Sequence, residues 1–580
     1  MPLRTIQKTY DQSELRGFRG VNLRRDRLSL ADEDLARAIN ADLHTKPGIV
    51  ILRKGRTPIF ETPLAGRNIR RLHRLGTSRY IVSARNLYRH GIASAQPSLI
   101  LSNLSRNLFT TLLSLRPFND SDTWVFIADD AQMYKDNGSD TYRWGIAAPT
   151  NAPSLSNGDG TGLTGAYSAV YTYVRLVGGL VAHESNPSDP SNTVNPSDKD
   201  IDIDVTASGD EQVTNIYIYR TVAGGSVYLY DRSTSNDTAT RTLSNADSAL
   251  GVAVETDNDV PPDMSWVVEH QGHAFGVRDA SYPHYLRWAK RFRPESWAPD
   301  NYIAVGNPDD PLLCAVSFTG FLGVWTPATK YRILGNDTQG FTHLEAVSKR
   351  GTRAPQATIG TEIGAVFVAS DGVFSTQMLQ PDLELSQSIE PMFHDDTVHD
   401  NAPIEWAEAS SMALARYKQR LYFAYTNTAG ERLLAVLSAD TGNWYFYDHP
   451  ATALYREEDA DRLVAGLQNG IVYFLEEGYL DAGSAITMTF APAERGQWEK
   501  RRFDYAYVDA DAMNGTVSVA IQVDGRTVRT LSITGARLRR RLRLPDGCVG
   551  TTWTAEVKYS GSEPVEVYAI RVLYLPLGGI

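Results

Sequence analysis

The sequence predicts an all-β protein in which a six-bladed β-propeller carries an inserted sandwich and a C-terminal β domain. Two observations favour this fold class. Strand–turn–strand units recur at irregular intervals along most of the chain, and strand patterns dominate almost everywhere after one short helical segment. Related units with loops of unequal length are typical of propeller blades. An array of β-sandwiches is the alternative that the same pattern allows.

One short helix is predicted near the start of the chain. Ser29-Leu-Ala-Asp32 has the spacing of a capping box, in which the two side chains bond to backbone N–H groups of the first turn. Leu35, Ile39 and Leu43 follow at four-residue intervals, so they fall on one face of a helix. Lys46-Pro47-Gly48 then ends the segment, because proline and glycine disfavour continuation.

Two strand–turn–strand units carry strong turn signals. Asp371-Gly372 joins the strands of residues 365–374, and Asn469-Gly470 joins those of residues 462–474. Asp-Gly and Asn-Gly accept positive φ at both central positions, which suits the twist of a two-residue hairpin. Looser copies of the pattern occur at residues 79–88, 124–134 and 419–447.

Residues 149–262 interrupt this series with a different composition. Turns rich in Gly, Ser, Asn and Pro alternate with short strands, as at residues 167–174, 201–205 and 213–220. Short alternating strands over roughly a hundred residues are typical of an immunoglobulin- or fibronectin-III-like sandwich. Because blade-like units lie on both sides, the segment is predicted to be an insertion into a blade loop.

The C-terminal part is again rich in strand patterns. A strand that starts at Gly515 ends in Asp524-Gly525, and residues 553–559 and 565–574 resemble paired strands. This pattern predicts a second sandwich, or an end domain packed on the propeller. The expected organisation is a docking segment with the helix at 1–60, first blades at 61–148, an inserted sandwich at 149–262, remaining blades at 263–480 and a C-terminal β domain at 481–580.

Charge is unevenly distributed along the 580-residue chain. The formal net charge of −11, from 57 basic and 68 acidic residues, argues against a general nucleic-acid coat protein, which is normally basic. Residues 1–150, however, carry 23 basic and 14 acidic side chains (+9), residues 151–262 carry 5 and 15 (−10), and the remainder carries 29 and 39 (−10). Segments of opposite charge are expected to face different surroundings.

The basic N-terminal portion is predicted to pack on acidic neighbouring subunits. The residues expected at this subunit interface are Arg24, Arg25, Arg53 and Arg56. Two denser basic clusters lie at residues 67–89 and 537–543. Phosphate contact is one interpretation of these clusters. A solvated face or a salt-bridge strip between subunits is the other, and it is favoured because aromatic residues do not interleave with the arginines.

No motif of catalysis, cofactor binding or metal binding has its required context. Residues 160–165 spell GxGxxG, but neither a strand before them nor a helix after them is predicted. Residues 394–400 gather His and Asp side chains without a known metal-ligand spacing. Residues 438–444 nearly spell the Asp-box turn of sialidase propellers, but once only, and no carboxylate pair for glycoside hydrolysis stands out. We therefore expect no enzymatic activity, no cofactor and no metal.

Cysteine and hydropathy patterns indicate synthesis in a reducing compartment and no membrane span. Cys314 and Cys548 form neither a disulfide framework nor a CxxC motif. The first residues lack the apolar region of a secretory signal. No run of about 18 uncharged apolar residues occurs, which a spanning helix would need.

Several stretches together resemble one family. Residues 18–28 (FRGVNLRRDRL), 35–40 (LARAIN) and Pro47-Gly48 look like the opening of many podophage tail proteins. Residues 142–149 (YRWGIAAP) and 567–576 (VYAIRVLYLP) add to this likeness. The chain resembles podophage tail nozzle proteins, including the tail tubular protein B type of T7-like phages.

This resemblance implies a structural protein of the virion, synthesised in the host cytoplasm. It implies a ring of six propeller-bearing subunits below the portal adaptor and near the tail fibre or spike proteins. The ring would retain packaged double-stranded DNA and conduct it during ejection, without sequence-specific binding. An acidic or mixed-charge wall would let a polyanion slide. The alternative function is a glycan-binding or glycan-degrading propeller of a tail spike.

Overall fold

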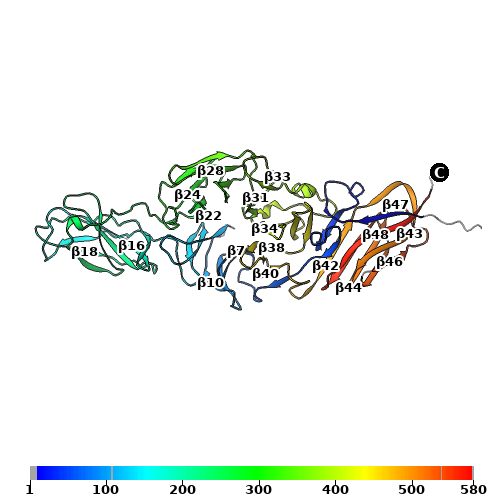
Figure 1. The fold of residues 1–580 in the computed structure, drawn as a ribbon, viewed down its shortest axis with the longest axis horizontal. Coiled ribbons are helices and arrows are strands. Elements are labelled where there is room, and N and C mark those ends of the chain that lie inside the picture. Colours follow the sequence, from blue (N-terminus) through cyan, green and yellow to red (C-terminus); the bar gives the residue numbers. More distant parts are fainter. Residues whose placement is uncertain (1–9, 106–108, 537, 578–580) are drawn as a thin grey trace, which may run out of the picture.

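The computed structural model describes residues 10–105, 109–536 and 538–577, and these are almost entirely β (Figure 1). The predicted all-β class is confirmed. The helical turns within the described residues are short 3-10 segments at Asp247–Ala249, Pro355–Ala357, Gln387–Phe393 and Trp406–Ser411. Figure 1 shows three units in a row, with one sandwich at each end and the propeller between them.

The central unit consists of seven antiparallel, four-stranded sheets within the described residues. Their innermost strands contact one another in a closed ring, which is the arrangement of a β-propeller. The strands of the seven blades are, in order, β7 (Ile69–Leu75), β8 (Ser78–Ser83), β9 (Asn86–Gly91) and β10 (Ser98–Leu101); β11 (Thr110–Leu115), β12 (Trp124–Asp129), β13 (Gln132–Asp136) and β14 (Thr141–Arg143); β22 (Met264–His270), β23 (His273–Asp279), β24 (Tyr285–Trp288) and β25 (Tyr302–Ala304); β26 (Cys314–Phe318), β27 (Phe321–Trp325), β28 (Lys330–Asn336) and β29 (Gly340–Glu345); β30 (Thr358–Thr361), β31 (Gly364–Ala369), β32 (Gly372–Thr376) and β33 (Leu383–Glu384); β34 (Ala413–Tyr417), β35 (Arg420–Thr426), β36 (Arg432–Ser438) and β37 (Trp444–Tyr447); and β38 (Ala451–Glu457), β39 (Arg462–Leu467), β40 (Val472–Leu475) and β6 (Arg56–Pro58).

The described strands therefore give seven blades where the sequence predicts six. The third and fourth blades carry no Asp-Gly or Asn-Gly signal, so the sequence pattern misses them. The first hairpins of these blades turn at Gln271-Gly272 and Thr319-Gly320. Glycine occupies the second turn position in both, but the first position holds Gln or Thr instead of the Asp or Asn that the turn signal requires.

The last blade is closed by a strand from the N-terminal segment. Phe474 in β40 pairs antiparallel with Thr57 in β6, so the first and last parts of the propeller share one sheet. The approach of β6 is close, because a Cβ atom on Gly55 would lie 1.9 Å from the backbone oxygen of Leu480. Glycine is therefore required where the chain enters the last blade.

The predicted N-terminal helix is wrong, because residues Asp34–Ile39 form strand β3. This strand pairs with β2 (Gly20–Val21) and with β42 (Ser484–Pro492). Ser29 does not cap a helix, since its hydroxyl donates to the carboxylate of Asp26. Four-residue spacing of apolar side chains is also compatible with the period of 2 of a strand, and pairing with a distant strand decides between the two.

The inserted segment folds as a two-sheet sandwich between β14 and β22. Alternating side chains of the two sheets fill its core, including Ile203 from one sheet and Tyr171 from the other, both fully buried. One sheet contains β15 (Ser154–Asn157), β18 (Ile201–Val205) and β21 (Ala239–Leu243); the other contains β17 (Leu180–Glu184), β16 (Ala169–Val177), β19 (Asn215–Arg220) and β20 (Leu229–Ser235).

The C-terminal unit is a second sandwich that incorporates strands from the chain start. β1 (Asp11–Arg16) and β5 (Val50–Leu52) pair with β48 (Glu566–Pro576), while β3 pairs with β42. The N-terminal segment is thus built into this sandwich. Its other strands are β4 (Ala41–Asp42), β41 (Leu480–Asp481), β43 (Arg495–Asp511), β44 (Met513–Val523), β45 (Arg526–Gly535), β46 (Leu538–Arg543) and β47 (Val549–Gly561).

Candidate functional site

The four arginines predicted at a subunit interface occupy two different environments. Arg24 and Arg25 are exposed, and Arg24 pairs with Glu390 at 3.0 Å. Arg53 is 0% exposed and its guanidinium donates to Asp481 within the same chain at 2.6–2.9 Å, so a contact between subunits does not fit it. Arg56 is half-buried beside the same carboxylate. Only the first two remain available to a neighbour.

Asp448, His449 and Asp481 lie close enough together to suggest a cation site, and Arg53 supplies the cation. Its guanidinium donates to both carboxylates at 2.6 Å. The pKa of His449 lies well below its usual range, because the imidazole is buried and two guanidinium groups, those of Arg53 and Arg56, lie nearby. This cluster therefore anchors the N-terminal segment to the connection between β37 and β38 and to β41.

The His/Asp-rich run at residues 394–400 holds the N-terminal segment. Asp400 pairs with Arg27 at 2.8 Å, and the His399 imidazole contacts the backbone oxygen of Arg25 at 2.7 Å. The GxGxxG run at residues 160–165 is a loop of the sandwich in which the Gly160 N–H donates to Asp200. These contacts give both motifs a structural role.

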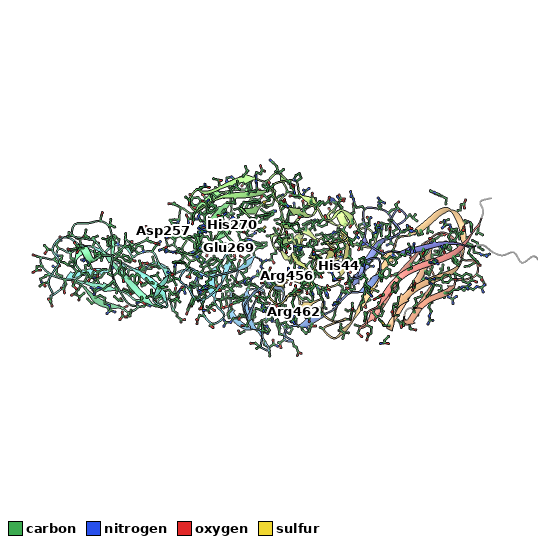
Figure 2. The ribbon with its side chains drawn as sticks, viewed as in Figure 1. His44, Asp257, Glu269, His270, Arg456 and Arg462 are labelled. Atoms are coloured by element: carbon green, nitrogen blue, oxygen red, sulfur yellow. The ribbon has the colours of Figure 1, made fainter. Side chains whose placement is uncertain are left out.

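A buried ionic network fixes the inserted sandwich to the propeller, at the junction marked by Asp257 in Figure 2. Lys135 from the second blade contacts Glu295 from the third blade at 2.5 Å. Arg175, on the sandwich strand β16, reaches Glu295 at 2.8 Å and Asp120 at 2.7 Å. Burial alone would raise the pKa of Glu295, but Lys135 and Arg175 outweigh it and lower this pKa to about 2. The carboxylate therefore stays charged and cross-links three structural units.

A cavity of about 440 Å³ opens beside this junction. Tyr217, Tyr219 and Tyr230 line it, with the ring of Tyr230 edge-on to the other two at 5.0 and 5.7 Å. Glu184 accepts a hydrogen bond from the Tyr219 hydroxyl at 2.6 Å. Burial raises the pKa of Glu184. The cavity thus combines aromatic surface with one partly buried carboxyl group.

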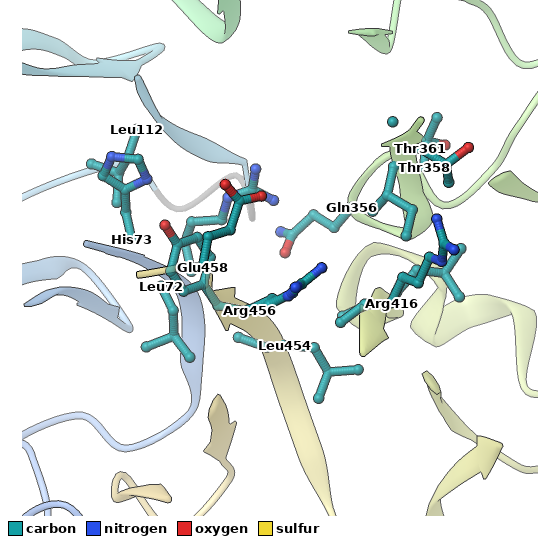
Figure 3. A pocket seen from close by; sticks show the side chains of 18 of the residues that line it. Leu72, His73, Leu112, Gln356, Thr358, Thr361, Arg416, Leu454, Arg456 and Glu458 are labelled. Carbon is teal, nitrogen blue, oxygen red and sulfur yellow. The ribbon is translucent and has the colours of Figure 1, made fainter. Parts of the chain in front are cut away.

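The centre of the propeller holds a second cavity, of about 490 Å³. Its walls come from the innermost strands of six of the seven blades within the described residues, all but β22. Figure 3 shows His73 and Leu112 on one side and Gln356 and Thr361 on the other, with Arg456 pointing into the space between them. Figure 2 places Arg456 near the middle of the propeller. We call this space the channel cavity.

The channel cavity is basic in a protein whose net charge is −11. Its lining includes the side chains of Arg70, Arg71, Arg416 and Arg456 against those of Glu362 and Glu458, a balance of +2. Burial, together with Arg71, lowers the pKa of His73 to about 4, so this imidazole is neutral at pH 7. In the sequence, Arg70 and Arg71 belong to the basic cluster at residues 67–89. Their spacing does not predict that a propeller strand places them at the channel cavity.

The second basic cluster gains aromatic neighbours that are distant in sequence. β46 pairs with β43, so that Arg541 lies opposite Tyr507 and Arg543 opposite Tyr505. The Arg541 guanidinium stacks over the Tyr505 ring at 3.8 Å. This is a cation–π contact between residues distant in sequence, and only strand pairing reveals it.

Comparisons with known proteins assign no function. The sequence matches no family model and no curated protein. Solved structures with partial likeness include an exo-β-1,3-galactanase from Phanerochaete chrysosporium (8% identity, 53% of this chain and 94% of that chain, TM-score 0.22). PorZ of the Porphyromonas gingivalis type-IX secretion system shares 11% identity over 81% of this chain and 70% of its own, with a TM-score of 0.25. A puromycin-hydrolysing peptidase of Mycobacterium tuberculosis shares 10% identity over 68% and 56%, with a TM-score of 0.26. Likeness at this level carries nothing about substrate or partner.

No helix among the described residues has the length and apolarity needed to cross a bilayer.

Proposed function

We propose that this chain is a structural, non-enzymatic subunit of the tail of a short-tailed phage. Six copies would form the ring-shaped nozzle below the portal adaptor, which retains packaged DNA and conducts it during ejection. The sequence stretches at residues 18–28, 142–149 and 567–576, which resemble podophage tail nozzle proteins, motivate the proposal.

One structural observation supports this function best: the three β units are joined as one elongated body. The Lys135–Glu295–Arg175 network ties the sandwich to two blades, and the C-terminal sandwich shares strands with the N-terminal segment. Buried ion-pair networks restrict relative movement of the elements that they join. Several rigid, elongated subunits of this kind could pack side by side and form the wall of a tube.

The charge distribution is compatible with a DNA conduit. Residues 151–262 carry a net charge of −10, and they form the sandwich at one end of the body. An acidic surface does not retain a phosphate backbone, because the like charges repel. DNA would therefore pass such a wall without being bound.

Electron microscopy of the purified protein and of virions tests the proposal. We expect rings of six subunits around an open channel, with the same body on the tail axis of the particle. Charge reversal of the two exposed arginines, as Arg24→Glu with Arg25→Glu, should weaken ring formation, whereas Arg526→Glu on the outer strand β45 serves as a control. A protein that stays monomeric at every concentration and never joins the tail axis would refute the proposal.

The tyrosine-lined cavity favours a second candidate function, glycan binding by a tail-spike propeller. Aromatic rings and a carboxyl group together suit a sugar, which offers both a CH face and hydroxyl groups. Glu255, the other carboxylate of this cavity, is paired with Lys290 and Arg293 at 3.1 Å. Binding is therefore favoured over hydrolysis, which needs two available carboxyl groups. A glycan array together with a hydrolysis assay on host envelope polysaccharide distinguishes the two activities.

A further inference from the structure

We propose that the channel cavity binds a compact anion that carries phosphate or carboxylate groups. This inference concerns a ligand inside one propeller and is independent of ring formation. The site consists of Arg71, Arg416 and Arg456, with neutral hydroxyl and amide groups between them.

The main observation is that Arg71 has no counter-charge. Among the described residues, its guanidinium makes no hydrogen bond and no ion pair; it lies over the Trp266 ring, 5.4 Å from the centroid. Protein atoms surround it closely enough that burial lowers its pKa. A partly buried charge without a partner is costly, and the ring face compensates only part of the lost hydration. An anion entering the cavity would supply the missing partner.

A second wall carries two further arginines that are free to turn toward the same ligand. The side chain of Arg416 makes no hydrogen bond or ion pair within the described residues. Arg456 pairs with Asp461 at 3.4 Å, and both side chains are about half exposed. An exposed pair of this kind is weak, so Arg456 can exchange its partner for a ligand. Three guanidinium groups would then meet one anion through charge-assisted hydrogen bonds.

The size of the cavity limits the ligand. A volume of about 490 Å³ suits a small molecule. A DNA duplex does not fit, so the site differs from any surface on which DNA slides. Thr358, Thr361 and Ser317 also line the cavity and offer hydroxyl groups to oxygen-rich ligands. A ligand whose size lies between that of pyrophosphate and that of a phosphorylated or carboxylated sugar matches the volume and the charge of the cavity.

The two acidic side chains of the lining, Glu362 and Glu458, are exposed. Within the described residues, neither lies within ion-pair distance of Arg71. They reduce the positive field without neutralising the partly buried guanidinium of Arg71, which therefore still lacks a counter-charge.

Isothermal titration calorimetry on the full-length protein tests the proposal. The probes are pyrophosphate, inorganic phosphate and citrate, each at constant ionic strength and pH 7.5. We expect at least one probe to bind with a 1:1 stoichiometry, and Arg71→Gln and Arg416→Gln each to raise its Kd at least tenfold. Arg526→Gln, an exposed arginine outside the cavity, should leave the Kd unchanged within twofold. Preference for pyrophosphate over citrate assigns a phosphate ligand, and the reverse a carboxylate ligand.

Two results would overturn the proposal: no heat above dilution for any probe, or equal Kd values in the wild type and both cavity variants. Thermal unfolding of each variant checks its fold, and Arg416→Gln decides alone if Arg71→Gln does not fold. If the protein is monomeric and binds anions, the proposed ring is refuted and the proposed anion site is supported. If it forms a ring but binds no anion, the ring is supported and the anion site is refuted.

Discussion

Lys135 Nζ lies 2.5 Å from Glu295 Oε2, and at most 1% of either side chain is exposed. The first prediction follows from this pair. Glu295→Gln should lower the free energy of unfolding by about 3–5 kcal/mol, because Lys135 would lose its buried counter-charge and Arg175 would keep only Asp120. Urea unfolding, together with limited proteolysis of the sandwich junction, measures the effect.

Glu255→Gln is the matched control for this variant. Glu255 pairs with Lys290 and Arg293 in the same region, but it is half exposed. Its loss should cost less than about 1 kcal/mol, as is usual for surface pairs. Equal destabilisation by both substitutions would contradict a special role for the buried network.

The second prediction concerns acid stability. Burial lowers the pKa of His183 to about 4. Because the unfolded chain takes up the proton near pH 6.5 and the folded chain does not, stability is complete above pH 6.5 and declines as the pH falls toward 4. The loss should reach about 3 kcal/mol for this residue. His183→Asn should remove this residue's share of the decline, as followed by chemical unfolding at a series of pH values. The remaining decline reflects other histidines whose pKa values are lowered by burial, such as His73 and His449.

The exposed His394 provides the comparison, as a His394→Asn substitution at the surface. Below pH 4.5 a further loss is expected in both variants. There the unfolded chain protonates Glu295, whose folded pKa of about 2 keeps it charged. A profile that is flat from pH 6.5 to 4 in the wild type would rule out a neutral buried His183.

The third prediction addresses closure of the propeller. Gly55→Ala places a Cβ atom 1.9 Å from a backbone oxygen, and it should lower the free energy of unfolding by more than about 2 kcal/mol. Gly209→Ala is the control, because a Cβ atom there meets nothing within 4 Å. Hydrogen exchange in β6 and β40 should rise only in the first variant. Normal protection of β6 in that variant would show that the strand does not close the blade.

The fourth prediction separates ion pairing from metal binding at the Asp448–Asp481 cluster. Arg53→Met should destabilise the protein by about 3–5 kcal/mol, because Asp481 would lose the guanidinium that donates to both of its oxygens and keep only the more distant Arg56. A chelator should leave the wild-type unfolding midpoint unchanged. A chelator-induced fall in that midpoint would instead indicate that a cation shares the cluster with Arg53.

Sequence patterns are most reliable where a turn depends on local chemistry. Asp524-Gly525 forms the predicted hairpin, with positive φ at both residues and Val523 paired with Arg526. The Asp371-Gly372 prediction is displaced by one residue, because Ala369 pairs with Gly372. Gly372 serves a close approach, since a Cβ atom there would lie 2.5 Å from the Ser386 hydroxyl. A dipeptide signal does not distinguish these two uses of glycine.

Features that depend on distant pairing could not be predicted from the sequence. The strand at Asp34–Ile39 depends on β42, and the closing strand β6 depends on β40. The channel cavity also depends on distant pairing. The sequence contains Arg71 and Arg416, but only closure of the ring of blades places both at the same cavity. The charge of these two residues is therefore known from the sequence, but their shared location is not.

Closure of the last blade by β6 also has a consequence for biosynthesis. Each strand of the inserted sandwich lies within one continuous stretch, so a nascent chain can complete that unit while still on the ribosome. β6 emerges earlier but has to wait for β40, which is synthesised after all the other blade strands. A polypeptide that ends before β40 therefore keeps an open ring with unpaired strand edges, which chaperones and proteases recognise. Only a chain that has reached β40 can present a closed propeller for assembly.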